Sequence, residues 1–243
     1  MGPPHRRTLQ RSIALFRTFL VEQTEPEVFY GALARDTIGI LGQHTALDNA
    51  TLLDVGCGPE QFAREFAARG VRYVGLDVDA HTVQAHPLAS AVVGVGERLP
   101  FADASFDVVM SSNVMEHVRQ PGLVADEMLR VAKPGGVVLI SYTAWLSPWG
   151  GHETSPWHYL GGTRAAQRYE QRTGQPPKNR FGSTMFAAYV GPGVRWSRRQ
   201  RQAEVLECVP RYHPSWASWV VAVPGLRELA SWNLLLVLRK TSA

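Results

Sequence analysis

The N-terminal part of the chain carries a helical pattern of apolar side chains. Ile13, Phe16 and Leu20 recur at spacings of three and four residues, which places them on one face of a helix. The pattern runs on to Gly42, a residue type that commonly ends a helix. We therefore expect residues 8–42 to be helical.

From Thr51 onward, short apolar runs alternate with helical stretches. Gly70 stands where a glycine commonly ends a helix. Strands that alternate with helices predict a parallel sheet covered by helices on both faces. The expected strands are residues 52–55, 71–76, 91–95, 106–111 and 137–142, and the expected helices between them are residues 61–69 and 123–132.

The regular pattern stops after Tyr142 for about fifty residues, in which tryptophans and tyrosines lie among paired glycines and prolines. A segment of this length without periodicity is usually a lid or a substrate-binding insertion. Regularity returns near Ala203, and the apolar run 233–239 predicts a buried terminal strand. Pro224-Gly225 prevents the stretch before it from forming one long helix. We divide this single domain into an N-terminal helical cap (1–48), a core (49–143), an insertion (144–202) and C-terminal hairpin strands (203–243).

The composition fits one globular domain, because 243 residues that are 45% hydrophobic are enough to build a sizeable core. Cys57 and Cys208 are the only cysteines, so neither a disulfide framework nor a CxxC metal site is expected. No apolar run approaches the ~20 residues that span a bilayer. The basic start is not followed by the apolar core of a signal peptide. These features predict a cytoplasmic protein.

The formal net charge of +4 conceals an uneven distribution. Residues 22–159 carry eight basic and seventeen acidic side chains, whereas residues 160–212 carry ten basic and three acidic ones. A basic face can meet phosphate, nucleic acid or an anionic membrane surface. An ordinary solvated surface rich in arginine explains the same pattern.

The most specific chemical signal is the turn after the first expected strand, at residues 52–60. Its Gly56-x-Gly58 lets the backbone approach a ligand closely, and the helix that follows offers its first amides to an anion. Asp77 ends the next strand twenty-one residues after Gly56, where a carboxylate can accept two ribose hydroxyls. The turn and the carboxylate together predict a site for a ligand that contains ribose.

Five ordered motifs over residues 50–143 carry a resemblance to a known family. They are Leu53-Asp-Val-Gly-Cys-Gly58, Gly75-Leu-Asp-Val78, Gly96-Glu-Arg-Leu-Pro-Phe101 with Ser105-Phe-Asp107, Ser112-Asn-Val-Met-Glu-His-Val118, and Leu129-Arg-Val-Ala-Lys-Pro-Gly-Gly136. In this order they resemble the class I S-adenosylmethionine-dependent methyltransferases, in particular the small-molecule branch that includes ubiquinone and menaquinone biosynthesis enzymes. The resemblance implies S-adenosyl-L-methionine as cofactor. It also implies an α/β fold with a Rossmann-like, seven-stranded, mostly parallel sheet of order 3-2-1-4-5-7-6, N-terminal helices and a lid insertion after strand 5.

The resemblance also assigns cofactor contacts. It places the two glycines against the methionine portion, Asp77 at the ribose and Val78 on the adenine. Tyr30 either closes over the cofactor or fills the core. Glu60 replaces the third glycine of the family and is expected to weaken cofactor binding, because it sets a carboxylate near the cofactor's own. The implied cofactor-binding residues are Tyr30, Asp54, Gly56, Gly58, Asp77, Val78, Gly96, Glu97 and Asn113.

Methyl transfer from an activated sulfonium needs mainly alignment, but a hydroxyl acceptor also gains from a general base, usually histidine. The candidates are His117 and His152, with Glu153 to orient an imidazole or bind the acceptor. We favour His152, because it lies in the insertion that should distinguish this acceptor from others. A structural role remains an equal alternative for His117.

A metal site is the other chemical option near these histidines. Asn113-x-x-Glu116-His117 resembles the Glu-x-x-Glu-His magnesium site of some family members. Asn113 stands in place of the first carboxylate, and magnesium prefers charged oxygen ligands. We therefore expect no metal.

The expected activity is methylation of an oxygen on a small molecule. Aromatic and arginine side chains in the insertion suit a sugar or glycolipid precursor. One alternative is a tRNA or other nucleic-acid methyltransferase, although no RNA-binding motif is present. Another is a non-catalytic subunit with a methyltransferase fold. A peripheral contact with a membrane surface stays open, and nothing in the sequence indicates an oligomeric state.

Overall fold

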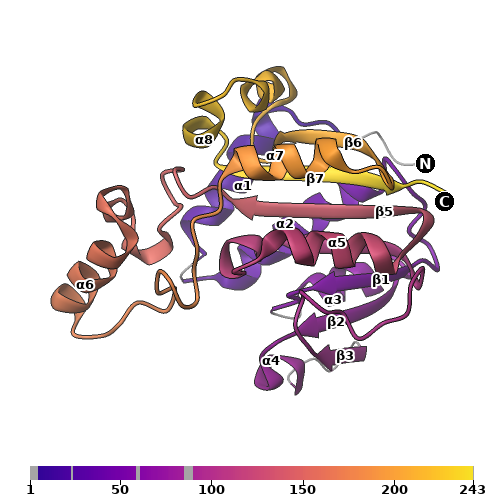
Figure 1. Ribbon diagram of the computed structural model, residues 1–243, viewed down its shortest axis with the longest axis horizontal. Helices are drawn as coiled ribbons and strands as arrows, with labels where there is room; N and C mark the ends of the chain where they lie inside the picture. Colours follow the sequence, from indigo (N-terminus) through magenta and orange to yellow (C-terminus); the bar gives the residue numbers. More distant parts are fainter. Residues whose placement is uncertain (1–4, 23, 59–60, 85–89, 243) are drawn as a thin grey trace.

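A computed structural model describes residues 5–22, 24–58, 61–84 and 90–242. Within these ranges, seven strands form one sheet in the order β3-β2-β1-β4-β5-β7-β6 (Figure 1). The pairs β1–β2, β1–β4, β2–β3 and β4–β5 are parallel, and β7 runs antiparallel to both β5 and β6. The expected strand order and the mostly parallel sheet are confirmed.

The elements have the following bounds. The strands are β1 Thr51–Val55, β2 Arg72–Asp77, β3 Ser90–Val93, β4 Phe106–Ser112, β5 Ala132–Thr143, β6 Ala203–Pro210 and β7 Asn233–Lys240. The α-helices are α1 Leu9–Leu20, α2 Pro26–Leu41, α3 Gln61–Ala67, α4 Ala80–Gln84, α5 Pro121–Val131, α6 Gly162–Thr173, α7 Val190–Arg199 and α8 Leu226–Ala230. Short 3-10 helices are η1 Met115–His117, η2 His152–Thr154, η3 Trp157–Leu160 and η4 Ser215–Ala222.

The sheet separates two apolar cores. One core joins α5 and α7 to the sheet, and the other joins α2 and α3 to the opposite face (Figure 1). In β7, Leu234, Leu236 and Leu238 belong to the first core, whereas Leu235 and Val237 belong to the second. In a strand buried on both faces, polar and apolar residues do not alternate. The sequence of the last strand is therefore a continuous apolar run.

The expected helical region 8–42 consists of two helices. Helix α1 ends at Leu20, and α2 begins at Pro26. Proline cannot continue a preceding helix, but it fits the first turn of a new one because that turn lacks an acceptor for its N–H. Near the C-terminus, Gly225 adopts a φ of +80° between η4 and α8, so the expected interruption at Pro224-Gly225 is confirmed.

The insertion is more regular than its sequence predicts, because it contains α6 and, at its end, α7. The buried side of α6 consists of Gly162, Ala165 and Ala166. Small residues produce no stripe of large apolar side chains, so the helical period is invisible in the sequence. In Figure 1, α6 lies to one side of the sheet, beyond the carboxyl end of β5.

A buried arginine connects the N-terminal helices to the sheet. Arg211 is fully buried and donates hydrogen bonds to the hydroxyls of Thr37, Ser112 and Ser141. Its guanidinium also lies 3.7 Å from the Asp36 carboxylate. The residue therefore joins α2 to β4 and β5 at one point inside the protein.

Candidate active site

The glycine turn follows directly from β1. Gly56 and Cys57 donate their N–H groups to the Leu76 carbonyl, at 2.7 and 3.1 Å, which holds the turn against the end of β2. Gly56 has a φ of +77°, and a Cβ there would lie 2.5 Å from the Val114 side chain. At Gly58, where φ is +51°, a Cβ would meet no side chain of the described residues within 4 Å. Glycine is therefore required at Gly56, where a side chain would overlap Val114.

Asp77 lies beside this turn at the end of β2. Its Oδ2 accepts a hydrogen bond from the Gly58 N–H at 3.2 Å, and its Oδ1 accepts one from the Asp79 N–H at 3.0 Å. A carboxylate has about four lone-pair sites, so two remain for ribose hydroxyls. The structure thus brings together the turn and the carboxylate that the sequence singles out.

The three expected adenine-side residues lie around the same strand ends. Val78 follows β2 and is 68% exposed. Gly96 and Glu97 follow β3, and a Cβ at Gly96 would contact Val55 and Val124, which places that backbone against the end of β1. Their contacts with the adenine remain predictions. Glu60 lies outside the described residues.

Asp54 lies in β1, two residues before the first glycine of the turn. It is buried in β1, and its Oδ2 accepts a 2.6 Å hydrogen bond from the Tyr73 hydroxyl. Burial raises the pKa of Asp54 to about 7 against the effect of that hydrogen bond, and the charge of Asp77 adds to the rise. A direct contact between Asp54 and the cofactor remains a prediction.

Two further expected residues, Asn113 and Tyr30, lie near the end of β4 and on α2. Asn113 adopts a φ of +58°, a conformation that asparagine tolerates better than most residues, and its Oδ1 accepts a 2.8 Å hydrogen bond from Asn233. Tyr30 is half-buried, packs against Phe29 and donates a 3.0 Å hydrogen bond to Glu22. Whether either residue touches the cofactor remains a prediction.

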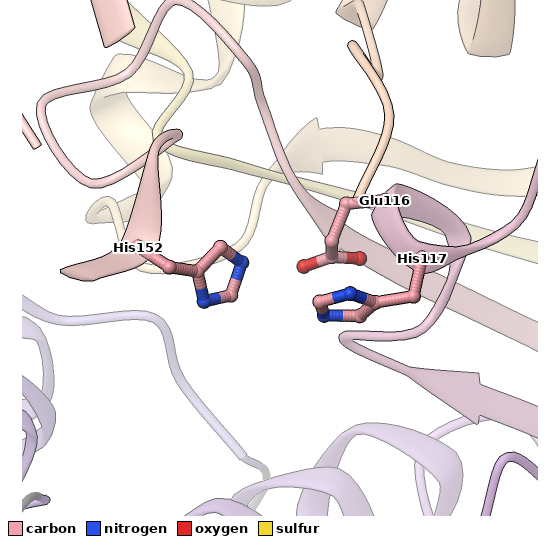
Figure 2. Close-up of side chains that lie close together, drawn as sticks. All are labelled: Glu116, His117 and His152. Atoms are coloured by element: carbon pink, nitrogen blue, oxygen red, sulfur yellow. The ribbon is translucent and has the colours of Figure 1, made fainter. Parts of the chain in front are cut away.

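Both candidate histidines meet at one carboxylate. Glu116 and His117 belong to η1, which follows β4, and His152 begins η2 in the insertion. One nitrogen or oxygen atom from each lies within 4.8 Å of the others, and Figure 2 shows both imidazoles beside the Glu116 carboxylate. The imidazole centroids of His117 and His152 are 5.1 Å apart.

The hydrogen bonds of this cluster are incomplete. Glu116 is 2% exposed, and its Oε1 accepts the Thr143 N–H at 3.0 Å, but its Oε2 has no partner among the described residues. His117 Nδ1 lies 2.8 Å from the Thr184 carbonyl, to which it donates in its neutral form, so Nε2 is left as an acceptor. The buried Nε2 of His152 also lacks a partner among these residues.

The environment of His152 favours a neutral imidazole. Burial lowers its pKa, while the Glu116 carboxylate acts in the opposite direction and the neighbouring His117 adds to the decrease. A neutral imidazole with an unpartnered ring nitrogen can accept a proton. The site therefore offers a base beside a buried carboxylate.

Glu153 contacts a loop of the insertion. Its two oxygens accept hydrogen bonds from the backbone N–H and the side-chain amide of Asn179, at 2.7 and 2.8 Å. Burial would raise the pKa of Glu153, but these hydrogen bonds outweigh it and hold the pKa below its usual value. The loop so anchored also carries Thr184, the partner of His117. Thr184 has no sequence signal as a partner of His117, because it acts there through its backbone carbonyl.

Comparisons with known proteins decide the family. Residues 53–140 match the model of the family described as "Methyltransferase domain". A curated relative from Mycolicibacterium vanbaalenii, named "Uncharacterized methyltransferase", is 49% identical, and the alignment covers 96% of each chain. This chain belongs to the class I S-adenosylmethionine-dependent methyltransferases.

The methyltransferase shares its fold with solved structures of low sequence identity. An S-adenosylmethionine-dependent methyltransferase from Mesorhizobium loti is 18% identical with a TM-score of 0.59, over 85% of this chain and 98% of that one. A chain from the structure titled "Complex between the Haloferax volcanii Trm112 methyltransferase activator and the putative methyltransferase" is 18% identical with a TM-score of 0.55, over 96% of this chain and 98% of that one. The cofactor of this methyltransferase is S-adenosylmethionine, for which the turn and Asp77 are suited.

The cluster of this methyltransferase also has the composition of a divalent-cation site. One carboxylate oxygen and two imidazole nitrogens form a ligand set that suits zinc, manganese or iron better than magnesium. Asn113, at the first position of the magnesium-like motif, already bonds to Asn233. The expectation of no metal remains a prediction. Separately, no helix in the described part of the chain is long and apolar enough to cross a membrane.

Proposed function

We propose that this methyltransferase transfers the methyl group of S-adenosylmethionine to an oxygen of a small-molecule acceptor, with sugars and glycolipid precursors as the class to test first. The observation that carries the proposal is the buried Nε2 of His152 beside Glu116, which has no hydrogen-bond partner among the residues that the structure describes. This cluster adjoins the cofactor half of the site, because Val114 packs against Gly56 two residues before Glu116.

The bound cofactor supplies a methyl group on a sulfonium that is already activated. The protein's part is to hold and align the two reactants. The backbone of the glycine turn and the Asp77 carboxylate hold the cofactor. His152 accepts the proton of the acceptor hydroxyl at Nε2, and the nearby Glu116 carboxylate stabilises the imidazolium that forms. His117, held by Thr184, lies beside the His152 imidazole.

The acceptor class can be tested with a mixture of metabolites. The protein is incubated with S-adenosylmethionine labelled in the methyl group and a metabolite extract, and label is measured in small-molecule, lipid and RNA fractions. We expect label in a sugar or glycolipid with the methyl carbon shift of an ether. Label in RNA would support the nucleic-acid alternative, and cofactor binding without any transfer would support the non-catalytic alternative.

A second candidate for the same site is a divalent cation held by Glu116, His117 and His152. It is favoured by the two buried ligand atoms that lack partners among the described residues, Glu116 Oε2 and His152 Nε2. Such an ion would polarise the acceptor oxygen. Metal content of the purified protein, measured by mass spectrometry, separates the two arrangements. Under our proposal the protein is metal-free and EDTA leaves turnover unchanged. Stoichiometric metal, with loss of turnover in EDTA, would favour the ion.

A further inference from the structure

Helix α1 turns a stripe of large apolar side chains away from the core. Leu9, Ile13, Phe16 and Leu20 are spaced by four, three and four residues, which places them on one side of the helix. Their exposed fractions run from 38% at Phe16 to 63% at Leu20, whereas Leu15 is the buried residue of this helix. The apolar stripe of a surface helix normally faces the core. In α1 it forms an outer surface.

Two exposed tryptophans continue this surface. Trp216 and Trp219 belong to η4 and are 70% and 56% exposed. Residues three apart in a 3-10 helix lie on the same side. The Ser215 N–H donates a 2.8 Å hydrogen bond to the Arg7 carbonyl, and Leu9 and Trp216 line one groove, so the starts of α1 and η4 lie side by side. The apolar face defined in this way consists of Leu9, Ile13, Phe16, Leu20, Trp216 and Trp219.

The charges beside the apolar face are basic. Neither α1 nor η4 contains an acidic residue. The carboxylate that lines the groove, Glu207, is already engaged by Arg7 and His44, at 3.0 and 2.8 Å. Arg6 and Arg17 are exposed, and neither has a carboxylate partner within the described part of the chain. Two arginines therefore remain available to an anionic partner.

This combination suits an anionic lipid surface. Tryptophan, phenylalanine and leucine insert at the boundary between headgroups and acyl chains, and arginines beside them bind anionic headgroups. A second copy of the chain fits less well, because a symmetric interface would set Arg6 and Arg17 on both of its sides. The exposed carboxylates that follow α1, Glu25 and Glu27, lie at the start of α2. Charge complementarity thus favours a lipid surface as the partner.

The apolar face reaches the proposed acceptor site. Phe16 contacts Trp149 of the insertion, with ring centroids 5.7 Å apart. The Trp149 carbonyl accepts the His152 N–H at 2.9 Å. One aromatic residue therefore separates the apolar face from the turn that carries the proposed base. A lipid surface bound to this face would lie beside the acceptor site.

We propose that α1 and η4 form a docking surface for an anionic membrane. The apolar face inserts at the level of the headgroups, α1 lies along the membrane plane, and Arg6 and Arg17 bind lipid phosphates. This docking goes beyond the proposed function and does not depend on it. Only the consequence that the acceptor is taken from the same membrane rests on the proposed function.

Flotation with lipid vesicles tests the docking without cofactor or acceptor. The full-length protein is mixed with vesicles of phosphatidylcholine alone, or of phosphatidylcholine with about one-third phosphatidylglycerol. Ile13→Gln and Trp216→Ser remove apolar surface, and Arg17→Gln removes a charge. The matched controls are Leu123→Gln, at a position of α5 that is 47% exposed, and Arg69→Gln, at an exposed position after α3. Circular dichroism shows whether each variant is folded.

We expect the protein to bind the anionic vesicles at least about fivefold more tightly than the neutral ones. Ile13→Gln and Trp216→Ser should each weaken this binding at least about fivefold, Arg17→Gln about threefold to fivefold, and the two controls less than about twofold. Equal binding to both kinds of vesicle would overturn the proposal, as would unchanged binding by Ile13→Gln and Trp216→Ser.

Sedimentation of the protein without lipid tests the competing partner. A dimer that Ile13→Gln converts to a monomer, in a protein that does not bind vesicles, would assign the apolar face to a second copy and overturn the membrane contact. The outcome is separable from that of the proposed function. Vesicle binding by a protein that methylates no acceptor would support the docking and contradict only the proposed function, whereas methyl transfer without vesicle binding would contradict only the docking.

Discussion

His117 and His152 face each other with imidazole centroids 5.1 Å apart, although one follows β4 and the other belongs to the insertion. Their hydrogen bonds differ. Nδ1 of His117 is engaged by the Thr184 carbonyl, whereas Nε2 of His152 is buried without a partner in the described structure. The two imidazoles are therefore not equivalent, and the difference leads to the first prediction.

His152→Ala should lower kcat by about a hundredfold or more, because a general base typically contributes ~10²–10⁴-fold to the rate. Affinity for S-adenosylmethionine should stay nearly unchanged. His117→Ala should act mainly on stability or cofactor binding. Steady-state kinetics on the acceptor and calorimetry with the cofactor measure the two effects. His44→Ala, at a histidine that bonds Glu207, is the control. Normal turnover by His152→Ala, with turnover abolished in cofactor-bound His117→Ala, would reverse the assignment.

Asp77→Ala should weaken cofactor binding by more than about tenfold, because two charge-assisted hydrogen bonds to the ribose are lost, each worth roughly 1.5–3 kcal/mol. The variant also removes the acceptor of the Gly58 N–H. Asp79→Ala removes a neighbouring carboxylate that, among the described residues, bonds only to the exposed turn at His81 and Thr82, so it is the matched control. Calorimetric titration measures both, and equal dissociation constants would exclude Asp77 from the ribose site.

Asp54 should make the cofactor-free protein lose stability as the pH rises from about 4 to about 7. In the unfolded chain this carboxyl ionises near 3.8, whereas burial raises its folded pKa to about 7. Between these values the folded state binds more protons, so the contribution is fully present below the lower value and lost through the upper one. Tyr73 lowers this folded pKa by its hydrogen bond, and the charge of Asp77 raises it.

Asp54→Asn isolates this effect, since the amide oxygen still accepts the Tyr73 hydroxyl but does not ionise. Urea unfolding at pH 5 and pH 8 should show a smaller loss of stability in the variant than in the wild type. The difference between them should be on the order of a few kcal/mol, because one unit of pKa shift corresponds to about 1.4 kcal/mol. Parallel pH profiles would show that Asp54 is already ionised in the folded protein.

Arg211→Leu should destabilise the protein by about 3–5 kcal/mol, because breaking a buried charge pair leaves polar partners without compensation. The hydroxyls of Thr37, Ser112 and Ser141 would each lose a donor. Asp36 would keep the two hydrogen bonds from Arg11, at 2.7 and 2.8 Å. Urea unfolding measures the change. Arg201→Leu, at an exposed position, should change stability by less than about 0.5 kcal/mol. Equal unfolding midpoints would contradict a structural role for Arg211.

Local pattern determined the sheet and the cofactor half of the site. Alternation of apolar strands with helices predicts parallel strands, and the resemblance carried by ordered motifs supplied their order. The glycine turn and Asp77 each follow directly after a strand. Because parallel strands place their carboxyl ends at one edge, residues at successive strand ends must meet there. Their proximity therefore follows from the sequence alone.

Only the tertiary structure shows how the insertion is arranged and which polar side chains are buried together. Helix α6 has only small buried residues, so packing rather than periodicity reveals it. The partners of His117 and Glu153 come from a loop distant in sequence, and the buried guanidinium of Arg211 finds its partners on α2, β4 and β5. Such contacts depend on how separate segments pack, and a polar residue has the same sequence signature whether it is solvated or buried with partners. Both histidines can be predicted from the sequence as candidate bases, but only the packed structure shows that they lie beside the same carboxylate, Glu116.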